Sequence, residues 1–352
     1  MSAKVPRVAV AYNAPVLPRD HPDAASEADV VEVARAVADA LRIQSFEPIL
    51  IPAKAPLNGF LEALDSAKPD LVFNLIEGFN GISAGATHLT SVFELLGLPY
   101  TGSPVEALAA CVSKSRAKAL LRGSGLPTTD SYRLESEGEL SFAINLLFPH
   151  ALQGGEKDRI HSCYLVKPDA EDGSLGIDQS SVVTNAHELQ LRVEFLLARY
   201  GGGVIVEPYL PGPEFNLGVI AVPEPRALAV AQIVFKPEIG NWPILTYAAK
   251  WDEGSVADLA SRPICPAPID PSRAERLSTI AVAAFQATGC RDYARVDLRL
   301  DKNGEPMILE VNPNPDIGPN AGWARAARVS GFSYEEAIGA IAREALKRGV
   351  ES

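Results

Sequence analysis

The sequence predicts an α/β protein with three lobes: a small open parallel sheet first, then two lobes of α+β structure. Two patterns predict this class. Short β-branched runs alternate with amphipathic stretches at the start of the chain, whereas further along strand patterns gather around single long helices. The length of 352 residues agrees, because chains of this size usually divide into several compact units. We expect lobes at residues 1–103, 104–211 and 212–352.

The first lobe has the pattern of a βαβαβ unit. Its apolar runs are RVAVAY, PILI and DLVFNLIEG, and the amphipathic stretches EADVVEVARAVADALR and LNGFLEALDSA separate them. Connections of this kind make strands parallel, and ligands then bind at the edge where the carboxyl ends of the strands meet. We therefore expect Asn74, Glu77 and Gly78 to lie at a ligand-binding edge.

The second lobe is expected to form strands around one long helix, HELQLRVEFLLARY. Lys167 ends the strand pattern YLVKP and precedes the loop PDAEDGSLG, whose glycines let the backbone approach phosphate oxygens. Taken alone, such a loop is more often an ordinary turn. Likewise, Lys114, Lys167 and Lys250 are each more often solvated than bound to a ligand.

The third lobe contains the sharpest local pattern, the hairpin ARVDLRLDKNGEPMILEVN. A long irregular connection, WPILTYAAKWDEGSVADLASRPICPAP, is expected before it. With a two-residue turn at 302–303, Asp297 lies opposite Ile308, and Arg295 lies opposite Glu310. One face is then polar, with Arg295, Asp297, Arg299, Glu310 and Asn312, and the other is apolar, with Val296, Leu298, Leu300, Met307, Leu309 and Val311.

The polar face of this hairpin permits two interpretations. Asp297, Glu310 and Asn312 supply two carboxylates and an amide oxygen, which are hard ligands that suit Mg²⁺ and leave positions for phosphate oxygens. A solvated strand face, with Arg295 paired to Glu310 across the hairpin, explains the pattern equally well. The hairpin alone does not decide between them.

The composition argues against several classes of protein. The 44 acidic and 32 basic residues give a net charge of -12, which repels nucleic acid and anionic membranes. No apolar run is long enough to cross a bilayer, and the segment MSAKVPRVAVAYNAP lacks the pattern of a secretory signal, so we expect a cytoplasmic protein. The widely spaced Cys111, Cys163, Cys265 and Cys290 do not favour a zinc site or a disulfide framework.

Taken in order, these segments resemble the ATP-grasp superfamily and, within it, the D-alanine:D-alanine ligases, over nearly the whole chain. The resemblance implies that ATP lies between the sheets of the second and third lobes, with two Mg²⁺ ions, or Mn²⁺ as an alternative. It also implies a homodimer. The matching segments are DLVFNLIEG, GLPYTGSPVEALAACVSKSRAKALLRGSGLPT, YLVKPDAEDGSLGI, VIVEPYLPGPEFNLGVI, YAAKW with a later ICP, and RVDLRL with ILEVNPNP.

The resemblance also implies a role for each matching residue. Lys114 and Lys167 would contact the phosphates of ATP beneath the loop around Ser174, and Lys250 would reach the γ-phosphate. Arg295 would stabilise charge on the reacting groups. The adenosine would be bound by Glu207, by the backbone of Pro208, Tyr209 and Leu210, and by Glu214, and the metal ions would be bound by Asp297, Glu310 and Asn312.

The implied reaction begins when a substrate carboxylate attacks the γ-phosphate, which gives an acyl phosphate and ADP. An amine then displaces phosphate and forms an amide. Positioning and charge neutralisation supply most of the catalysis in such a reaction, and no protein nucleophile is needed. Because acyl phosphates hydrolyse, the loops at 170–176 and 250–262 are expected to act as lids that exclude water.

The substrate half departs from the pattern of the D-alanine:D-alanine ligases. Glu77 stands where that family has a histidine, and Asp316 and Ala321 stand near positions of a glycine and a serine that bind the second substrate's carboxylate. Gly173 and Trp251 replace a serine and a tyrosine that help to latch the lid. The latch must therefore differ.

These replacements predict a different substrate. Glu77 and Asp316 should disfavour an acidic group and favour a cationic or hydroxylated one. The alternative is that other donors replace the missing ones. Glu27 could hold a substrate ammonium, or it could stabilise the dipole of a helix that begins there. The candidate replacement donors are Asn314, Asn320 and Arg325.

The leading functional hypothesis is a ligase that joins an amino acid or similar carboxylate to an amine. D-Alanyl-D-alanine synthesis is the second hypothesis, and a regulator that binds ATP without turnover is the third. A pure binder would not need every one of the charge-neutralising groups that this chain retains. A kinase that stops at phosphoryl transfer is a further alternative.

Overall fold

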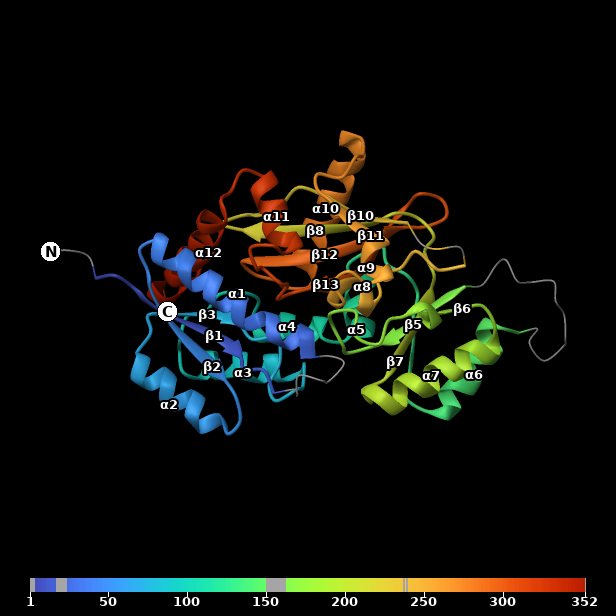
Figure 1. The fold of residues 1–352 in the computed structure, drawn as a ribbon, viewed down its shortest axis with the longest axis horizontal. Coiled ribbons are helices and arrows are strands. Elements are labelled where there is room, and N and C mark those ends of the chain that lie inside the picture. Colours follow the sequence, from blue (N-terminus) through green and yellow to red (C-terminus); the bar gives the residue numbers. More distant parts are fainter. Residues whose placement is uncertain (1–3, 17–23, 150–162, 237, 239, 352) are drawn as a thin grey trace.

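The structure is a computed structural model that describes residues 4–16, 24–149, 163–236, 238 and 240–351, while the side chains of residues 24–28, 350 and 351 lie outside the description. Three sheets organise this part of the chain. In Figure 1 the three-stranded sheet lies on the left and the four-stranded sheet on the right, with the six-stranded sheet above and between them. The predicted α/β class is confirmed.

The first sheet confirms the predicted βαβαβ unit. Its strands pair in parallel in the order β2-β1-β3, with Ala11 opposite Ile51 on one side and Asn74 on the other. Asn13 and Glu77 lie at or just after the carboxyl ends of β1 and β3. The elements are β1 (Arg7–Asn13), α1 (Ala24–Ile43), β2 (Glu47–Ala53), α2 (Leu57–Ala67), β3 (Leu71–Leu75) and, after them, α3 (Gly85–Leu95).

The four-stranded sheet is antiparallel and has the order β4-β7-β5-β6. Leu189, Val193 and Leu196 from one helix pack on it and fill its core. The elements are β4 (Tyr132–Leu134), α6 (Glu137–Leu147), β5 (Tyr164–Pro168), the 3₁₀ turn η3 (Gln179–Ser181), β6 (Val182–Val183), α7 (Ala186–Tyr200) and β7 (Val204–Pro208).

The six-stranded sheet has the path β11-β10-β8-β12-β13, and β9 pairs with β8. The connection predicted to be irregular instead forms α8 (Tyr247–Trp251), α9 (Val256–Leu259) and the edge strand β11 (Ser261–Ile264). The other elements are β8 (Glu214–Ala221), β9 (Pro225–Ala227), β10 (Ala231–Phe235), α10 (Pro271–Ala287), β12 (Tyr293–Leu300), β13 (Pro306–Asn312) and α11 (Gly322–Val329).

The hydrophobic cores do not stop at the predicted lobe borders. Cys111 at the end of α4 (Val105–Cys111) and Leu121 in α5 (Lys114–Gly123) join the core of the six-stranded sheet. The last helix, α12 (Tyr334–Glu351), packs against α1 and β3. The division at residues 103 and 211 stays a prediction.

The predicted register of the β12–β13 hairpin is wrong. Asp297 lies opposite Glu310, and Arg295 lies opposite Asn312. One cause is the turn, where Gly304 adopts a φ of 82° and its N–H donates to the Asp301 carbonyl at 3.1 Å, so that the loop has an extra residue. The other cause is a β-bulge beside Asp297, which shifts the register once more.

The bulge also changes which side chains of β13 face the core. Ile308 and Val311 both lie in the core of the sheet, although they are three positions apart. Leu309 and Glu310 instead both line a cavity on the other face. The predicted apolar face is therefore wrong at Leu309 and also at Met307, which is half-buried outside that core.

The four cysteines are free thiols, buried at Cys111 and Cys290 and half-buried at Cys163 and Cys265. Among the described residues, no three His, Cys, Asp or Glu side chains are grouped to hold a metal ion. The helices in the same part of the chain include none with both the length and the apolar character needed to cross a membrane.

Candidate active site

A cavity of about 1180 Å³ lies between the four-stranded and six-stranded sheets. The cavity therefore has one wall from each of the two sheets, as the sequence predicted for a nucleotide site. Every predicted nucleotide-binding and metal-binding residue except Lys114 and Asn312 lines it. From the four-stranded sheet and its loops come Lys167, Ser174, Glu207, Tyr209 and Leu210, and from the other side come Glu214, Lys250, Arg295, Asp297 and Glu310.

Glu207 lies near the end of β7 as a buried carboxylate between two lysines. Its Oε1 lies 2.8 Å from the Nζ of Lys167, and its Oε2 lies 2.8 Å from the Nζ of Lys118. The hydroxyl of Thr129 also donates to Oε2 at 2.6 Å. Burial would raise the pKa of Glu207, but the two ammonium groups hold it below its usual range.

Lys118 is a residue of this site that the sequence interpretation missed. It follows Lys114 by one helical turn in α5, so both lysines project from the same face of the helix. The spacing of the two lysines was the one signal in the sequence. The structure adds that both side chains are buried, where a lysine needs an anionic partner.

The next part of the cavity wall holds Glu214 beside Arg299. The guanidinium of Arg299 lies 3.4 Å from the carboxylate of Glu214 and donates to the hydroxyl of Tyr209 at 3.3 Å. Burial raises the pKa of Glu214 to about 7, although Arg299 opposes the shift. The ring of Tyr209 packs edge-on against Trp242 with centroids 5.2 Å apart.

The predicted metal ligands converge on one face of the hairpin. The amide nitrogen of Asn312 lies 3.2 Å from an oxygen of Asp297 and 3.4 Å from an oxygen of Glu310. A half-turn of this amide group would direct its oxygen to the same place. Two carboxylates and an amide oxygen then form a hard donor set with room for phosphate oxygens, which fits Mg²⁺.

Arg295 does not pair with Glu310, so the solvated-face interpretation of the hairpin is wrong. It binds Asp297 with two nitrogens, at 2.8 and 2.9 Å. Glu310 instead lies 3.8 Å from the ammonium of Lys114. Burial would raise the pKa of Glu310, but Lys114, Lys167 and Arg295 lower it to about 2.

The loop after β5 lies where the sequence placed a phosphate loop. Gly173 and Ser174 both adopt a φ of 64°, and Gly176 adopts 70°. Within the loop the N–H of Leu175 donates to the carbonyl of Asp172 at 3.1 Å, and the glycines leave no side chain that would keep the backbone away from phosphate oxygens. The ammonium of Lys114 donates to the carbonyl of Glu171 and so fixes the start of this loop.

A latch joins this loop to helix α8. The indole N–H of Trp251 donates to the carbonyl of Gly173 at 2.8 Å. A side chain and a backbone carbonyl, at two positions that lack the family's hydroxyl groups, therefore form a different contact between the same two segments. Farther along, the N–H of Tyr247 donates to the carbonyl of Ile177 at 3.0 Å.

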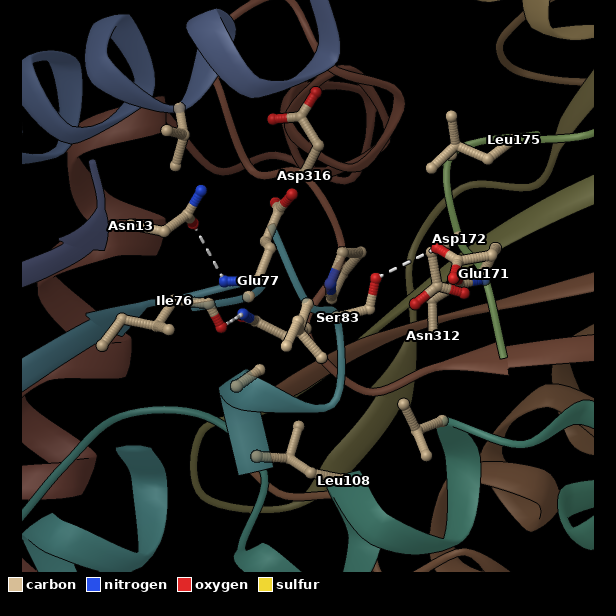
Figure 2. A pocket seen from close by; sticks show the side chains of 18 of the residues that line it. Asn13, Ile76, Glu77, Ser83, Leu108, Glu171, Asp172, Leu175, Asn312 and Asp316 are labelled. Carbon is tan, nitrogen blue, oxygen red and sulfur yellow. Dashed lines mark hydrogen bonds between the residues drawn. The ribbon is translucent and has the colours of Figure 1, made fainter. Parts of the chain in front are cut away.

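The first lobe is also tied to the loop. The hydroxyl of Ser83 donates to the carboxylate of Glu171 at 3.2 Å, as Figure 2 shows. The segments predicted as lids, 170–176 and 250–262, therefore contact each other. The first of them also contacts the loop between β3 and α3, in which Ser83 lies.

A second cavity, of about 680 Å³, opens at the carboxyl ends of β1 and β3. The two cavities meet along a shared wall, which consists of Asp29, Val33, Gly173, Lys250, Trp251, Arg295 and Asp316. The ammonium of Lys250 lies 5.1 Å from the centre of the Trp251 ring. The lysine is exposed to the cavities, and desolvation inside them and the neighbouring Arg295 lower its pKa. Two groups that react with each other could approach these cations from opposite sides.

The second cavity is acidic. Figure 2 shows Glu77 and Asp316 on one side of it and Glu171 and Asp172 on the other. The side chain of Glu77 is exposed on the cavity wall, and desolvation inside the cavity raises its pKa to about 7, with the charges of Asp316, Asp172 and Asp29 adding to the effect and Lys250 opposing it. These carboxylates repel one another, so the cavity favours a cation.

The replacement donors proposed for a carboxylate are partly engaged. The amide of Asn314 donates to the carbonyl of Ile76 at 3.1 Å. Arg325 lines the larger cavity and donates to the carbonyl of Asn320 at 3.1 Å. Ala321 lines the same cavity and offers no side-chain donor.

Glu27 lies in α1, but its side chain is outside the described residues, so the substrate role suggested for it is not tested.

Comparison with known proteins places these features in a family context. A family profile described as D-ala D-ala ligase C-terminus matches residues 124–343. The uncharacterized protein y4sG of Sinorhizobium fredii is 34% identical over 79% of this chain and 75% of its own. The D-alanine–D-alanine ligase of Gluconobacter oxydans is 31% identical over 89% of this chain and 93% of its own.

The fold is similar to a solved structure over almost its full length. The D-alanine–D-alanine ligase of Bacillus anthracis, in a crystal structure complexed with ATP, superposes with a TM-score of 0.73. The superposition covers 99% of both chains at 19% sequence identity.

Proposed function

Because this chain belongs to the D-alanine–D-alanine ligase family of ATP-grasp proteins, we propose that it is an ATP-dependent carboxylate–amine ligase whose substrate pocket has diverged. The enzyme would form an amide through an acyl phosphate and release ADP and phosphate. One observation carries this proposal: the nucleotide-sized cavity and the acidic cavity meet at Lys250 and Arg295.

The nucleotide side of the reaction follows from the charges in the larger cavity. Glu207 and the backbone up to Leu210 would bind adenine, and Glu214 would bind the ribose hydroxyls. Lys114 and Lys167 are buried near the phosphate loop, where they would neutralise the phosphates.

Asp297, Glu310 and Asn312 would hold Mg²⁺, which supplies charge neutralisation at the phosphates when it is bound.

The transfer step would take place where the two cavities join. A substrate carboxylate held beside Lys250 and Arg295, where the two cavities meet, attacks the γ-phosphate, and the P–O bond to ADP breaks. Lys250 and Arg295 stabilise the negative charge on the transferring group, which is the main contribution a protein makes to this reaction. The amine then attacks the acyl carbon, phosphate leaves, and the amine loses a proton. The latch of Trp251 on Gly173 keeps water from the acyl phosphate.

The diverged pocket points to a substrate that carries a cationic or hydroxylated group. Glu77 and Asp316 lie on the same side of the acidic cavity and disfavour a free carboxylate there. A cation between them would relieve their repulsion. A hydroxyl group could donate a hydrogen bond to either.

D-Alanyl-D-alanine synthesis is the second candidate. The observation that favours it is the name shared by several relatives that align over most of this chain. It requires Asn320, Arg325 or a backbone N–H to bind the carboxylate of the second D-alanine. A homodimer remains a prediction, and the cytoplasm, which supplies ATP, remains the expected location.

The test is the release of ADP and phosphate from ATP and Mg²⁺ with amino acids supplied singly and in pairs. Hydroxylamine is added to trap any acyl phosphate as a hydroxamate. A ligase gives phosphate and an amide only with both substrates, or a hydroxamate with the donor alone. A stable phosphorylated product would indicate a kinase, and no ADP under any condition would contradict the proposal.

A further inference from the structure

Lys118 is the most deeply buried lysine of the nucleotide site, with 1% of its surface exposed. Its ammonium lies 2.8 Å from Glu207, and it donates to the hydroxyls of Thr128 and Thr129 at 3.0 and 2.9 Å. A fourth contact, to the carbonyl of Ile308, measures 3.3 Å. Three ammonium protons are therefore fully used, and the side chain is fixed.

Lys167 differs from Lys118 in two respects. It lines the nucleotide cavity, whereas Lys118 does not and stands behind Glu207. It also contacts the other oxygen of that carboxylate, Oε1, at 2.8 Å. An ammonium on the cavity wall can turn toward a ligand, but one that is enclosed by four protein oxygens cannot.

The two lysines also differ in their other anionic neighbours. The charges of Glu310 and Glu214, as well as that of Glu207, act on Lys167, so Lys167 can leave Glu207 without losing every counter-charge. The phosphates of a nucleotide would be a further anionic partner, and the lysine on the cavity wall is the one that can reach them.

We propose that Lys118 is the positioning residue that holds Glu207 ionised and aimed into the cavity, so that Lys167 can leave Oε1 for the phosphates while Oε1 accepts the adenine amino group. The proposal rests on the proposed function, because it assumes that ATP binds in this cavity. Thr129 assists by fixing Oε2.

The position of Lys118 predicts that its loss affects two properties, the affinity for ATP and the preference for adenine. Without it, Lys167 is the one remaining cation on Glu207, and it cannot serve both the carboxylate and the phosphates. Binding of ATP should weaken, and the preference for an adenine amino group should weaken with it. Burial lowers the pKa of Lys118 while Glu207 opposes that shift, so the charge on the lysine depends on this pair.

The experiment compares ATP with ITP, which has a carbonyl in place of the amino group. Calorimetry gives the dissociation constant of each nucleotide for the wild type, for Lys118→Met and for Arg116→Met, a control that removes an exposed cation from the same helix. We expect Lys118→Met to lower the ATP-over-ITP preference by roughly tenfold or more, because a misplaced Glu207 no longer accepts a hydrogen bond from the adenine amino group. Arg116→Met should leave the preference unchanged. In turnover, the KM for ATP should rise more than kcat falls.

The outcomes separate this inference from the proposed function. If the wild type binds neither nucleotide, the proposed function fails. If the wild type prefers ATP and folded Lys118→Met keeps the full preference, the role of Lys118 is wrong. If Lys118→Met does not fold, Thr129→Val, which removes one hydrogen bond to Glu207, decides: a reduced preference supports the proposal, and an unchanged preference overturns it.

Discussion

The two halves of the site treat their carboxylates in opposite ways. In the nucleotide half, Glu207 lies between two lysines and Asp297 is bound by Arg295. In the substrate half, Glu77 faces Asp316 and Asp29, and its pKa rises to about 7 from desolvation and from these charges. In the first half Glu207 and Asp297 are in direct contact with cations, whereas the wall of the second cavity carries Asp29, Glu77, Glu171, Asp172 and Asp316 against Arg199, Lys250 and Arg295.

Under the proposed function, this difference predicts which part of the ligand each half binds. A phosphate chain adds negative charge, which Lys114, Lys167 and Lys250 of the nucleotide half would neutralise. The substrate half gains most from a ligand that brings positive charge, because such a ligand lowers the repulsion among carboxylates. The comparison therefore predicts large effects when the nucleotide half loses a charge, and selective effects when the substrate half does.

The largest effect is expected from Glu310→Gln or Lys167→Ala. Each removes a charge from the nucleotide half, so turnover should fall by roughly a thousandfold or more. The measurement is ADP release at saturating ATP, with circular dichroism to show that the fold is intact. Glu305→Gln on the same hairpin and Arg116→Ala on α5 are matched controls, because both side chains are exposed. Normal turnover in either main variant would falsify the site.

The next effect is expected from Glu77→Gln. Removing this charge should raise the KM for a cationic substrate by roughly tenfold, equivalent to about 1.4 kcal/mol, while the KM for ATP changes little. Steady-state kinetics with each substrate varied in turn measures both constants. Glu62→Gln, an exposed position on α2, serves as the control. An equal rise in both KM values would contradict the assignment of Glu77 to the substrate half.

These variants also show how far the sequence alone could lead. The βαβ unit was predictable, because strand and helix periodicity depends on local sequence. The residues expected to bind the nucleotide came from the family resemblance, and most of them line one cavity. The hairpin register was not, because the extra turn residue at Gly304 and the bulge beside Asp297 shift pairing without changing the alternation of residues. Lys118 was missed because its partner, Glu207, lies in another element.

The substrate chemistry expected from Glu77 and Asp316 stays a prediction, and their contacts could not be predicted from the sequence. Glu77 and Asp316 were recognised as departures from a family pattern, and the structure places both on the wall of one cavity. The latch of Trp251 on Gly173 was not foreseen, because a backbone carbonyl as acceptor leaves no mark in the sequence.

A smaller effect is expected from pH. Glu77 is protonated below its pKa of about 7 and ionised above it. The KM for a cationic substrate should therefore fall as the pH rises from about one unit below that value to about one unit above. Glu214 titrates in the same range, so ATP must be saturating at each pH. In Glu77→Gln the KM should stay flat, and an unchanged slope would assign the titration to another group.

The smallest effect is expected from Trp251→Phe. The phenyl ring keeps the packing but loses the hydrogen bond to Gly173, which is worth about 1 kcal/mol. More acyl phosphate should then be hydrolysed, so ADP release should exceed amide formation by a few-fold. Val256→Ala, an exposed change on the same lid, should leave the two amounts equal. Equal amounts in Trp251→Phe would show that the latch does not exclude water.

The most direct test of the acidic half is a competition between two kinds of acceptor in the wild-type enzyme. D-Alanine, which carries a free carboxylate, is compared with amino-acid amides and diamines. The donor is the acid that gives a hydroxamate. With this donor, kcat/KM for amide formation is measured for each acceptor. The charges of Glu77 and Asp316 predict higher values for acceptors that lack a carboxylate. A higher value for D-alanine, with a dipeptide as the product, would contradict the prediction and identify the enzyme as a D-alanine–D-alanine ligase.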